Sequence, residues 1–343
     1  MHRHTTLLVL LGLVACGDDA SPMIDAAMID APTIDAPMTD APIDAPAPEP
    51  TIIAEFDGAS FQLPESLAFH DGLAYLSFLN GSVVTVAPDG TVTNFGSVAI
   101  DPAGSAYGLG ITVAPDGSVY LAMAKASGES TFPSGVYRIP ATGGAGTEFA
   151  THPELFIPND LDLDDGGNAY ITADGRLYRT NGSAAELWIE DPLLASSDGT
   201  ASAPCGVRTS PFPIGANGIV VETDRVVVGN TEHGSLVTVP ILADGSAGSA
   251  ELLVMDTDLC GIDGLAADGA SFLATVLGSQ LVRISADATT VIHEGLPLRS
   301  PSGVDVGMFG TARQAIVANP DFEAAFGAGG PASAQPNLTA VPL

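Results

Sequence analysis

The chain carries very little positive charge. Only 10 of its 343 residues are Lys or Arg, and Lys125 is the single lysine, whereas 41 residues are Asp or Glu. The formal net charge is therefore −31. Nucleic acids and anionic membrane surfaces are bound through basic patches, so this balance argues against both as partners. We expect no nucleic-acid partner, and contact with a membrane only through a covalently attached lipid.

No apolar run is long enough to cross a bilayer. The run at residues 7–15 is interrupted only by Gly12 and follows a short basic stretch. A membrane-spanning helix needs roughly 20 apolar residues, so residues 1–15 are predicted to be a secretory signal peptide. The run ends in Leu13-Val14-Ala15-Cys16-Gly17, which resembles a bacterial lipobox. The resemblance implies cleavage before Cys16, lipidation of its thiol and export to the cell envelope, where the lipid holds the protein on a membrane. The alternative is an ordinary signal peptide with a chance cysteine.

Residues 16–50 lack any basic side chain and any pattern typical of packed structure. Beyond Cys16, short Ile/Met/Thr-Asp-Ala-Pro units recur about every five residues. Recurrent proline removes backbone donors, and the aspartates repel one another, so we expect a disordered tether.

The remaining residues, 51–343, repeat one pattern six times. Each segment is an apolar strand, a turn usually containing Asp and Gly, and a second apolar strand. The segments begin at Leu67, Ile111, Leu161, Ile219, Leu265 and Val304, at intervals of 44, 50, 58, 46 and 39 residues. Four strands fit in each interval, and four-stranded repeats of about 40–45 residues are typical of β-propeller blades. We therefore predict an all-β fold, a six-bladed β-propeller.

The two ends of this domain are predicted to close the ring. Thr51 to Phe56 and Leu338 to Leu343 both read as strands, and we expect both in the last blade. Helix is nearly absent, with one possible turn from Phe322 to Phe326.

Cysteine is scarce, with three in the chain. If Cys16 carries a lipid, Cys205 and Cys260 are left, and such a pair in an exported protein is commonly oxidised to a disulfide. Two buried free thiols are the alternative. A zinc site is not supported, because the chain has no CxxC motif.

Several catalytic and metal-binding motifs are missing. The histidines form no HxxxH pair, and no serine lies in a G-x-S-x-G motif, so an α/β-hydrolase is not indicated. Asp160, Asp162 and Asp164 imitate a calcium loop without its glycine and its final glutamate, and are predicted to share one face of a strand. His233 and His293 are candidate proton carriers.

One position of the repeat concentrates oxygen ligands. Two residues before the first apolar residue of each repeat stand Glu65, Leu109, Asn159, Asn217, Asp263 and Ser302. In a propeller these positions lie where the innermost strands begin, around one end of the central tunnel. Two carboxylates and two amide carbonyls form a donor set suited to Ca²⁺. Asn-Gly and Asp-Gly are also ordinary turn dipeptides, which is the competing interpretation of residues 217–218 and 263–264.

The sequences around these residues resemble the ligand motifs of the senescence-marker-protein/gluconolactonase superfamily, which is similar to paraoxonases and diisopropylfluorophosphatase. The matching segments are Pro64-Glu65, Pro158-Asn159-Asp160, Ala216-Asn217-Gly218 and Asp263-Gly264. The resemblance implies a calcium ion, or another divalent metal, bound by Glu65, Asn159, Asn217 and Asp263. It also implies hydrolysis of a lactone or related ester, with Asp263 as the carboxylate that assists the reaction.

Two departures from that family bear on the substrate. Glu65-Ser66-Leu67 stands where gluconolactonases often have Glu-Gly-Pro, and Ile157 stands where sugar-lactone relatives have Arg. A less polar substrate is therefore as consistent with the sequence as a sugar lactone. We expect the loops around the mouth to be largely apolar, with Phe78, Leu79, Phe132, His233, Val276 and Leu277 lining it.

Two functions follow from these observations. The first is a secreted, monomeric, metal-dependent hydrolase acting on a small molecule. The second is a non-catalytic propeller, like the NHL-repeat proteins, that binds a protein or ligand at the cell envelope. The fold alone cannot decide between them.

The lipobox gives a direct prediction about Cys16. Cys16→Ala removes the thiol that would carry the lipid, so the domain should move from the membrane fraction to the soluble fraction or accumulate unprocessed. Cell fractionation checks this, and unchanged membrane attachment would contradict it.

Overall fold

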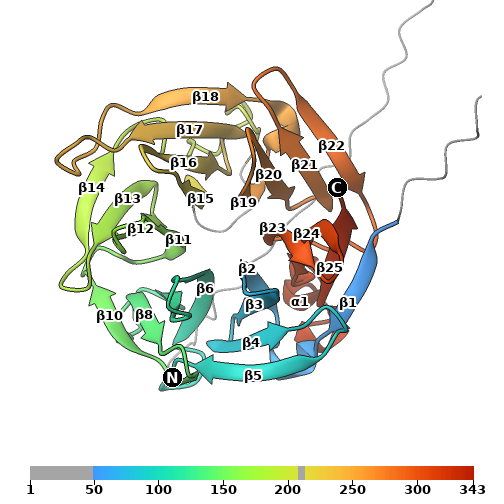
Figure 1. Ribbon diagram of the computed structural model, residues 1–343. Helices are drawn as coiled ribbons and strands as arrows, with labels where there is room; N and C mark the ends of the chain where they lie inside the picture. The colour runs from blue at the N-terminus through green and yellow to red at the C-terminus, as the bar shows by residue number, and fades with distance from the viewer. Residues whose placement is uncertain (1–48, 208–212) are drawn as a thin grey trace, which may run out of the picture.

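The structure is a computed structural model that describes residues 49–207 and 213–343, and it is a six-bladed β-propeller. The predicted signal peptide, Cys16 and nearly all of the predicted tether lie outside the described residues. Figure 1 looks along the propeller axis and shows the six sheets arranged around the centre. The ring is closed, because the six innermost strands contact one another in sequence and the last contacts the first.

Each blade is a four-stranded antiparallel sheet, as the repeat predicts. From the centre outwards, the first blade consists of β2 (Pro64–His70), β3 (Leu73–Phe78), β4 (Ser82–Val86) and β5 (Val92–Ser97). The second blade consists of β6 (Ala106–Val113), β7 (Val119–Lys125), β8 (Gly135–Ile139) and β10 (Thr147–Thr151). The third blade consists of β11 (Pro158–Leu163), β12 (Ala169–Ala173), β13 (Arg176–Thr180) and β14 (Glu186–Glu190). The fourth blade consists of β15 (Ala216–Val221), β16 (Arg225–Asn230), β17 (Ser235–Pro240) and β18 (Glu251–Met255). The fifth blade consists of β19 (Ile262–Asp268), β20 (Ser271–Val276), β21 (Gln280–Ile284) and β22 (Thr289–Glu294). A short strand, β9 (Gly144–Ala145), pairs in parallel with β5.

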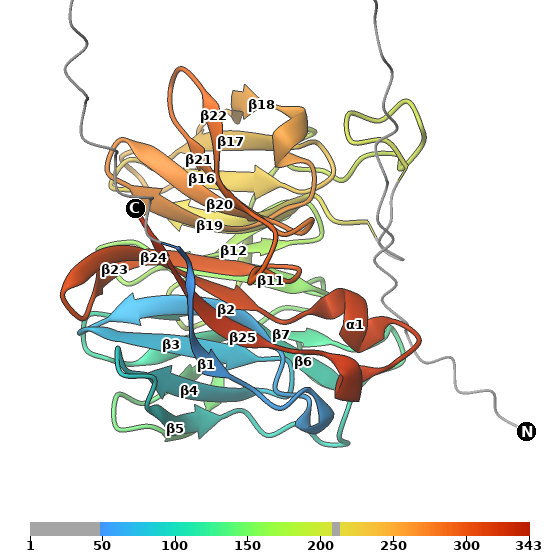
Figure 2. The ribbon, with the colours of Figure 1, turned by 90° about the vertical axis from the view of Figure 1, so that its right-hand side faces the viewer.

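The sixth blade combines both ends of the domain. It consists of β23 (Gly303–Phe309), β24 (Ala312–Asn319), β25 (Asn337–Pro342) and β1 (Thr51–Glu55). The predicted closure is confirmed, since β1 pairs with β25 and Thr51 lies opposite Ala340. Figure 2 shows β1 lying alongside β25 at the side of the ring.

Helix is almost absent among the described residues. The helices are α1 (Phe322–Phe326), which is the predicted turn, and the 3-10 turns η1 (Gly58–Ser60), η2 (Thr257–Leu259) and η3 (Pro331–Ser333). No helix in the described part of the chain is both long and apolar enough to cross a membrane.

The blades are held together by the apolar faces of their sheets. Six hydrophobic clusters lie between neighbouring blades, one at each of the six junctions. Val, Leu, Ile and Ala dominate them, as expected for β-branched and small residues between two pleated surfaces. Tight turns join the strands; at the first, Asp71 and Gly72 both have positive φ (49° and 77°), the conformation of a two-residue hairpin turn.

Candidate metal centre

The predicted ligand positions coincide with a β-bulge. In five of the six innermost strands, the register against the second strand shifts by one residue at this point. The bulge segments contain Glu65, Leu109, Asn159, Asn217 and Asp263. A bulge re-aims side chains locally, so the same device is repeated around one end of the propeller axis, which we call the tunnel. The sixth strand pairs without a shift, and Ser302, which precedes it, donates its hydroxyl to the carbonyl of Glu65 (2.5 Å).

The Asn-Gly and Asp-Gly pairs are parts of strands and not turns. Gly218 lies in β15 and Gly264 in β19. A Cβ atom at Gly218 would collide with the carbonyl oxygen of Asp263, and one at Gly264 would collide with that of Ser302. Glycine is needed here because neighbouring innermost strands approach closely at this end of the tunnel.

Buried hydroxyl groups tie these strands together. A Ser or Thr of one blade donates a hydrogen bond to a backbone carbonyl at the bulge level of the next. The bonds are Ser77 to Leu109 (2.5 Å), Thr172 to Asn217 (2.7 Å), Thr231 to Ile262 (2.7 Å), Thr275 to Ser302 (3.0 Å) and Ser302 to Glu65 (2.5 Å). We call this set the hydroxyl belt. It satisfies backbone oxygens that the bulges remove from the sheet ladder.

Three of the four predicted ligands are brought together. Glu65, Asn217 and Asp263 are all buried, with 8%, 3% and 8% of their surface exposed. A hydrogen bond links the side chains of Asn217 and Asp263. Desolvation raises the pKa of Glu65 well above its ordinary value, and the nearby carboxylates of Asp263 and Asp160 raise it further. Desolvation also raises the pKa of Asp263 to about 7. Asn159 is half-buried in the bulge of β11.

Asp160 belongs to this group and was missed from the sequence. Its carboxylate acts electrostatically on Glu65 and Asp263, and desolvation raises its pKa to about 8. It accepts hydrogen bonds from the backbone N–H groups of Leu161 (2.9 Å) and Ile219 (3.3 Å). A signal was present, because the residue after the bulge position is Gly or Ser in the other blades and charged only here.

Two more carboxylates face neighbouring innermost strands further along the tunnel. Asp162 on β11 accepts from the N–H of Val221 (2.8 Å), and Asp305 on β23 accepts from that of Phe69 (2.7 Å). Desolvation raises the pKa of both to about 6. Among the described residues, no Arg, Lys or His forms an ion pair with Glu65, Asp263 or any of these three aspartates. The negative charge of the tunnel is therefore uncompensated by this part of the chain.

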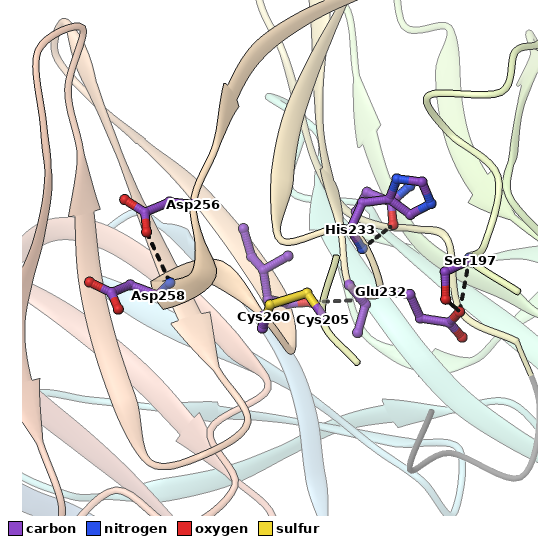
Figure 3. Close-up of a disulfide and its surroundings, with 10 residues drawn as sticks. Ser197, Cys205, Glu232, His233, Asp256, Asp258 and Cys260 are labelled. Atoms are coloured by element: carbon purple, nitrogen blue, oxygen red, sulfur yellow. Dashed lines mark hydrogen bonds between the residues drawn. A yellow bond between two sulfur atoms is a disulfide. The ribbon is translucent and has the colours of Figure 1, made fainter. Parts of the chain in front are cut away.

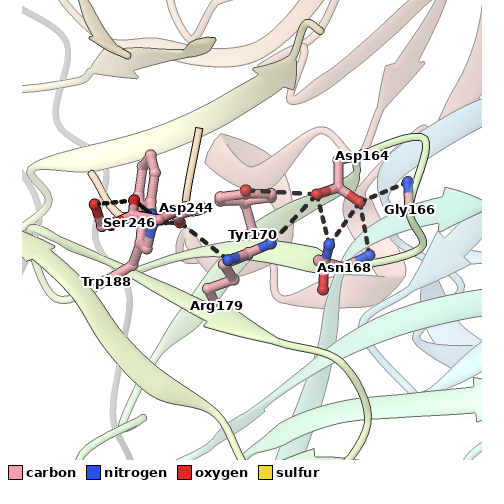
Figure 4. Close-up of polar contacts among 9 residues, drawn as sticks. Asp164, Gly166, Asn168, Tyr170, Arg179, Trp188, Asp244 and Ser246 are labelled. Atoms are coloured by element: carbon pink, nitrogen blue, oxygen red, sulfur yellow. Dashed lines mark hydrogen bonds and ion pairs between the residues drawn. The ribbon is translucent and has the colours of Figure 1, made fainter. Parts of the chain in front are cut away.

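The prediction that alternating aspartates share one strand face holds for Asp160 and Asp162 only. Asp164 follows the end of β11 and caps its turn through the N–H groups of Gly166 (2.9 Å) and Asn168 (2.8 Å). Figure 4 shows it beside Arg179, which donates to the carbonyl of Gly245 (3.0 Å). A cavity of about 410 Å³ lies there, between the third and fourth blades and at the opposite end of the strands from Asn159.

A disulfide joins Cys205 to Cys260, which confirms the predicted pairing. Figure 3 shows it linking the long connection before β15 to the segment that leads into β19. Cys260 precedes the candidate ligand Asp263 by three residues. Close by, the carboxylate of Glu232 accepts from the N–H of Ser197 (2.9 Å) and from that of Ile214 (2.7 Å), so it holds both ends of the same connection.

The structure corrects part of the predicted rim. Phe78, Leu79, Phe132 and Val276 are buried in hydrophobic clusters and do not line the mouth. His293 lies on the outermost strand β22 and contacts the carbonyl of Leu296 (3.0 Å), far from the innermost strands. His233 is half-buried in the turn between β16 and β17.

A different apolar group lies at this end of the ring. Half-buried side chains pack around Leu63 and Leu79 just before β2 and just after β3. They are Phe61, Tyr107, Leu109, Phe322, Phe326 and Ala334. Leu109 occupies the bulge position that carries an oxygen ligand in the blades on either side, so this apolar group adjoins the carboxylates.

No three His, Cys, Asp or Glu side chains of the described chain form a ready metal-binding group. A site here depends on amide oxygens as well as carboxylates, because Glu65 and Asp263 are the only charged members of the predicted set.

No protein-family model matches the chain, and no curated protein matches its sequence. Solved structures match its fold. A gluconolactonase from Xanthomonas campestris has a TM-score of 0.54 at 15% identity, over 82% of this chain and 86% of that one. A luciferin-regenerating enzyme has a TM-score of 0.57 at 13% identity, over 82% and 92%. A chain of a nidogen–laminin complex has a TM-score of 0.50 at 15% identity, over 73% and 89%. The structural neighbours thus include gluconolactonase-type propellers, and at such identities they show the fold alone.

The disulfide predicts a free-thiol count. Its loop spans 55 residues, and closing a loop of that size stabilises the folded state by about 4 kcal/mol in the chain-entropy model. The denatured, unreduced domain comprising residues 49–343 should show no reactive thiol with Ellman's reagent. Two reactive thiols would contradict the bridge. Cys205→Ser with Cys260→Ser should lower the free energy of unfolding in urea.

The tunnel carboxylates predict an unusual pH dependence. Their folded-state pKa values, about 6 for Asp162 and Asp305 and about 8 for Asp160, exceed the unfolded value of about 4. The folded state therefore binds more protons than the unfolded state between about pH 4 and pH 8, and stability falls as the pH rises through this window. Without divalent metal, the midpoint of urea unfolding should be higher at pH 5 than at pH 8.

Asp305→Asn removes one of the carboxyl groups that ionise in this range, so it should reduce the difference between the urea midpoints at pH 5 and pH 8. Asp89→Asn, at an exposed aspartate in a turn, should leave it nearly unchanged. Equal stability of the unsubstituted domain at both pH values would refute the assignment.

Proposed function

We propose that this protein is a divalent-metal-dependent hydrolase, with calcium as the favoured ion, that acts on lactones or related esters. The observation that carries the proposal is the convergence of Glu65, Asp263 and Asn217 at one end of the tunnel with no basic partner among the described residues. Burying carboxylates without a counter-charge is costly, and a bound cation removes that cost. The gluconolactonase among the structural neighbours supports the lactonase-type reaction class.

The residues present fit a hard divalent cation. Glu65 and Asp263 supply two negative charges, and the amide oxygens of Asn217 and Asn159 add coordination without charge. Such an all-oxygen set matches Ca²⁺ and suits softer metals poorly. Asp160 adds a third carboxylate next to the set. It is positioned to supply further negative charge to the site.

Each residue has a role in the proposed reaction. When bound, the metal supplies Lewis acidity toward the substrate carbonyl oxygen. Asp263 accepts a proton from the attacking water, whose oxygen adds to the carbonyl carbon. The ring C–O bond then breaks, and the leaving oxygen takes up the proton, which gives the hydroxy acid. Glu65 and Asn217 hold the site in place.

The apolar group around Leu109 favours substrates with a hydrocarbon portion. Phe61, Tyr107 and Phe326 are half-buried beside it and can receive an alkyl chain. We therefore place alkyl lactones and aryl esters ahead of polyhydroxylated sugar lactones.

The proposed enzyme is exported and lipid-anchored. Residues 1–15 would be removed as a signal peptide, Cys16 would carry the lipid, and residues 16–50 would act as the tether. The propeller of residues 51–343 would then act as a monomer on a small molecule outside the cytoplasm.

Asp263→Asn tests the proposal directly. The substitution keeps the size of the side chain but removes one carboxylate and the proposed base. Calcium affinity, measured by calorimetric titration, should fall, and turnover of a lactone and aryl-ester panel should fall at least about 100-fold. Circular dichroism should show an unchanged β-rich fold.

Leu109→Asn is the matched control, because it changes an equivalent bulge position without removing a ligand. It should keep calcium binding while reducing turnover of alkyl lactones relative to small polar ones. The absence of calcium binding by the unsubstituted protein at millimolar concentration would overturn the metal site. Calcium binding with no hydrolysis across the panel would assign the propeller to the binding class instead.

A further inference from the structure

Thr231 occupies a rigid position between two candidate ligands. It is buried, with 8% of its surface exposed, in the turn that follows β16. Its backbone N–H donates to the carbonyl of Gly215 (3.1 Å), and its carbonyl accepts from the N–H of Gly261 (3.0 Å). The side chain is therefore carried by a backbone that is fixed on both sides.

The hydroxyl group of Thr231 donates one hydrogen bond and accepts another. Its oxygen lies 2.7 Å from the carbonyl oxygen of Ile262 and 2.9 Å from Nδ2 of Asn217. A carbonyl can only accept, so the single hydroxyl proton is donated to Ile262. The hydroxyl oxygen must then accept from Asn217, which fixes the amide with its NH₂ group toward Thr231.

This arrangement determines where the amide oxygen of Asn217 points. The other proton of Nδ2 is donated to the carboxylate of Asp263, so Thr231 and Asp263 together hold the NH₂ group, and Oδ1 lies at the opposite edge of the planar amide. No hydrogen bond from the described residues reaches Oδ1, so it stays free to bind a cation. A flipped amide would instead present its N–H groups, which a cation repels. Ile262 is also the residue directly before Asp263, so the same hydroxyl fixes the backbone of the second ligand.

Thr231 differs from the other members of the hydroxyl belt. Thr172 accepts from the backbone N–H of Asp160 (3.0 Å), and Thr275 accepts from that of Gly264 (2.8 Å). In the fourth blade, Gly229 stands at the position equivalent to Thr172 and Thr275 and has no hydroxyl group. The hydroxyl group of this blade comes from Thr231, two residues later. It accepts from a ligand side chain where the other two threonines accept from backbone.

We propose that Thr231 is a positioning residue for the metal centre, which, together with Asp263, holds the amide of Asn217 in the orientation that leaves its oxygen free to bind a cation. This inference rests on the proposed function and goes beyond it by assigning to one hydroxyl a part in orienting a ligand. Partners of metal ligands typically change metal affinity about 10- to 100-fold when they are removed.

The test compares two threonines of the hydroxyl belt: Thr231 accepts a hydrogen bond from a ligand side chain, and Thr275 accepts one from the backbone. Thr231→Val replaces the hydroxyl by a methyl group and should weaken calcium binding about 10- to 100-fold in calorimetric titration. Thr275→Val makes the same chemical change in the same belt, at a hydroxyl that contacts only backbone. It should lower the melting temperature of the metal-free domain to a similar extent but change calcium affinity less than about threefold. Thr231→Ser should keep the affinity of the unsubstituted protein.

The outcomes separate this inference from the proposed function. If the unsubstituted protein takes up no calcium, the metal site itself fails. If it does, and Thr231→Val binds calcium as tightly, the positioning role of Thr231 is wrong while the site stands. Equal weakening by Thr231→Val and Thr275→Val would also overturn the role, because it would reflect the belt as a whole. Should Thr231→Val not fold, Thr231→Cys is a milder replacement and should weaken binding by an intermediate factor.

Discussion

The close approach of six innermost strands around one axis is the constraint on which the rest of the structure depends. At the bulge end, the backbones come so near that a Cβ atom cannot fit at Gly218 or Gly264. The bulges interrupt the sheet ladder, so backbone oxygens there need other donors. Ser and Thr hydroxyls supply them from the neighbouring blade. The same crowding removes carboxylates such as Glu65 and Asp263 from water, and their perturbed ionisation follows from it.

The repeat made the architecture predictable. Strand, Asp-Gly turn and strand recur at blade-sized intervals, and a closed ring of six sheets accommodates them, with the last blade made of one N-terminal and three C-terminal strands. The sequence also showed that Glu65, Asn217 and Asp263 stand at the same position of the repeat. They were expected to lie together because equivalent positions in a ring face the same tunnel. The pairing of Cys205 with Cys260 followed from elimination and from their places in adjacent repeats.

Other features depend on geometry that one sequence does not contain. A bulge is defined by the partner strand, so the charge of Asp160 could be seen in the sequence, but its place beside Glu65 and Asp263 could not. Phe78 and Phe132 were expected at the rim because the loops after the second strands were expected to line the mouth, but both side chains pack in the core between blades. Thr231 carries no motif at all. Its importance comes from Asn217 and Ile262, which belong to different blades and meet only in the folded ring.

The acidic tunnel opposes folding at neutral pH, so binding of the proposed cation would be coupled to folding. Hydrophobic clusters between the blades stabilise the ring. The carboxyl groups inside it are hard to ionise because they are desolvated, and their ionisation at neutral pH destabilises the folded state. In the proposed site the fold has already gathered the like charges, so the site would be preorganised for a cation.

The pairing of β1 with β25 has a consequence for the order in which the ring assembles. Thr51 lies opposite Ala340, so nearly the whole domain separates two strands that must meet. Synthesis delivers β1 first and β25 last, since a chain grows from its N-terminus. Until β25 has been made, β1 lacks this partner and the sixth blade is incomplete. The ring of six complete blades therefore cannot close before β25 is available to pair with β1.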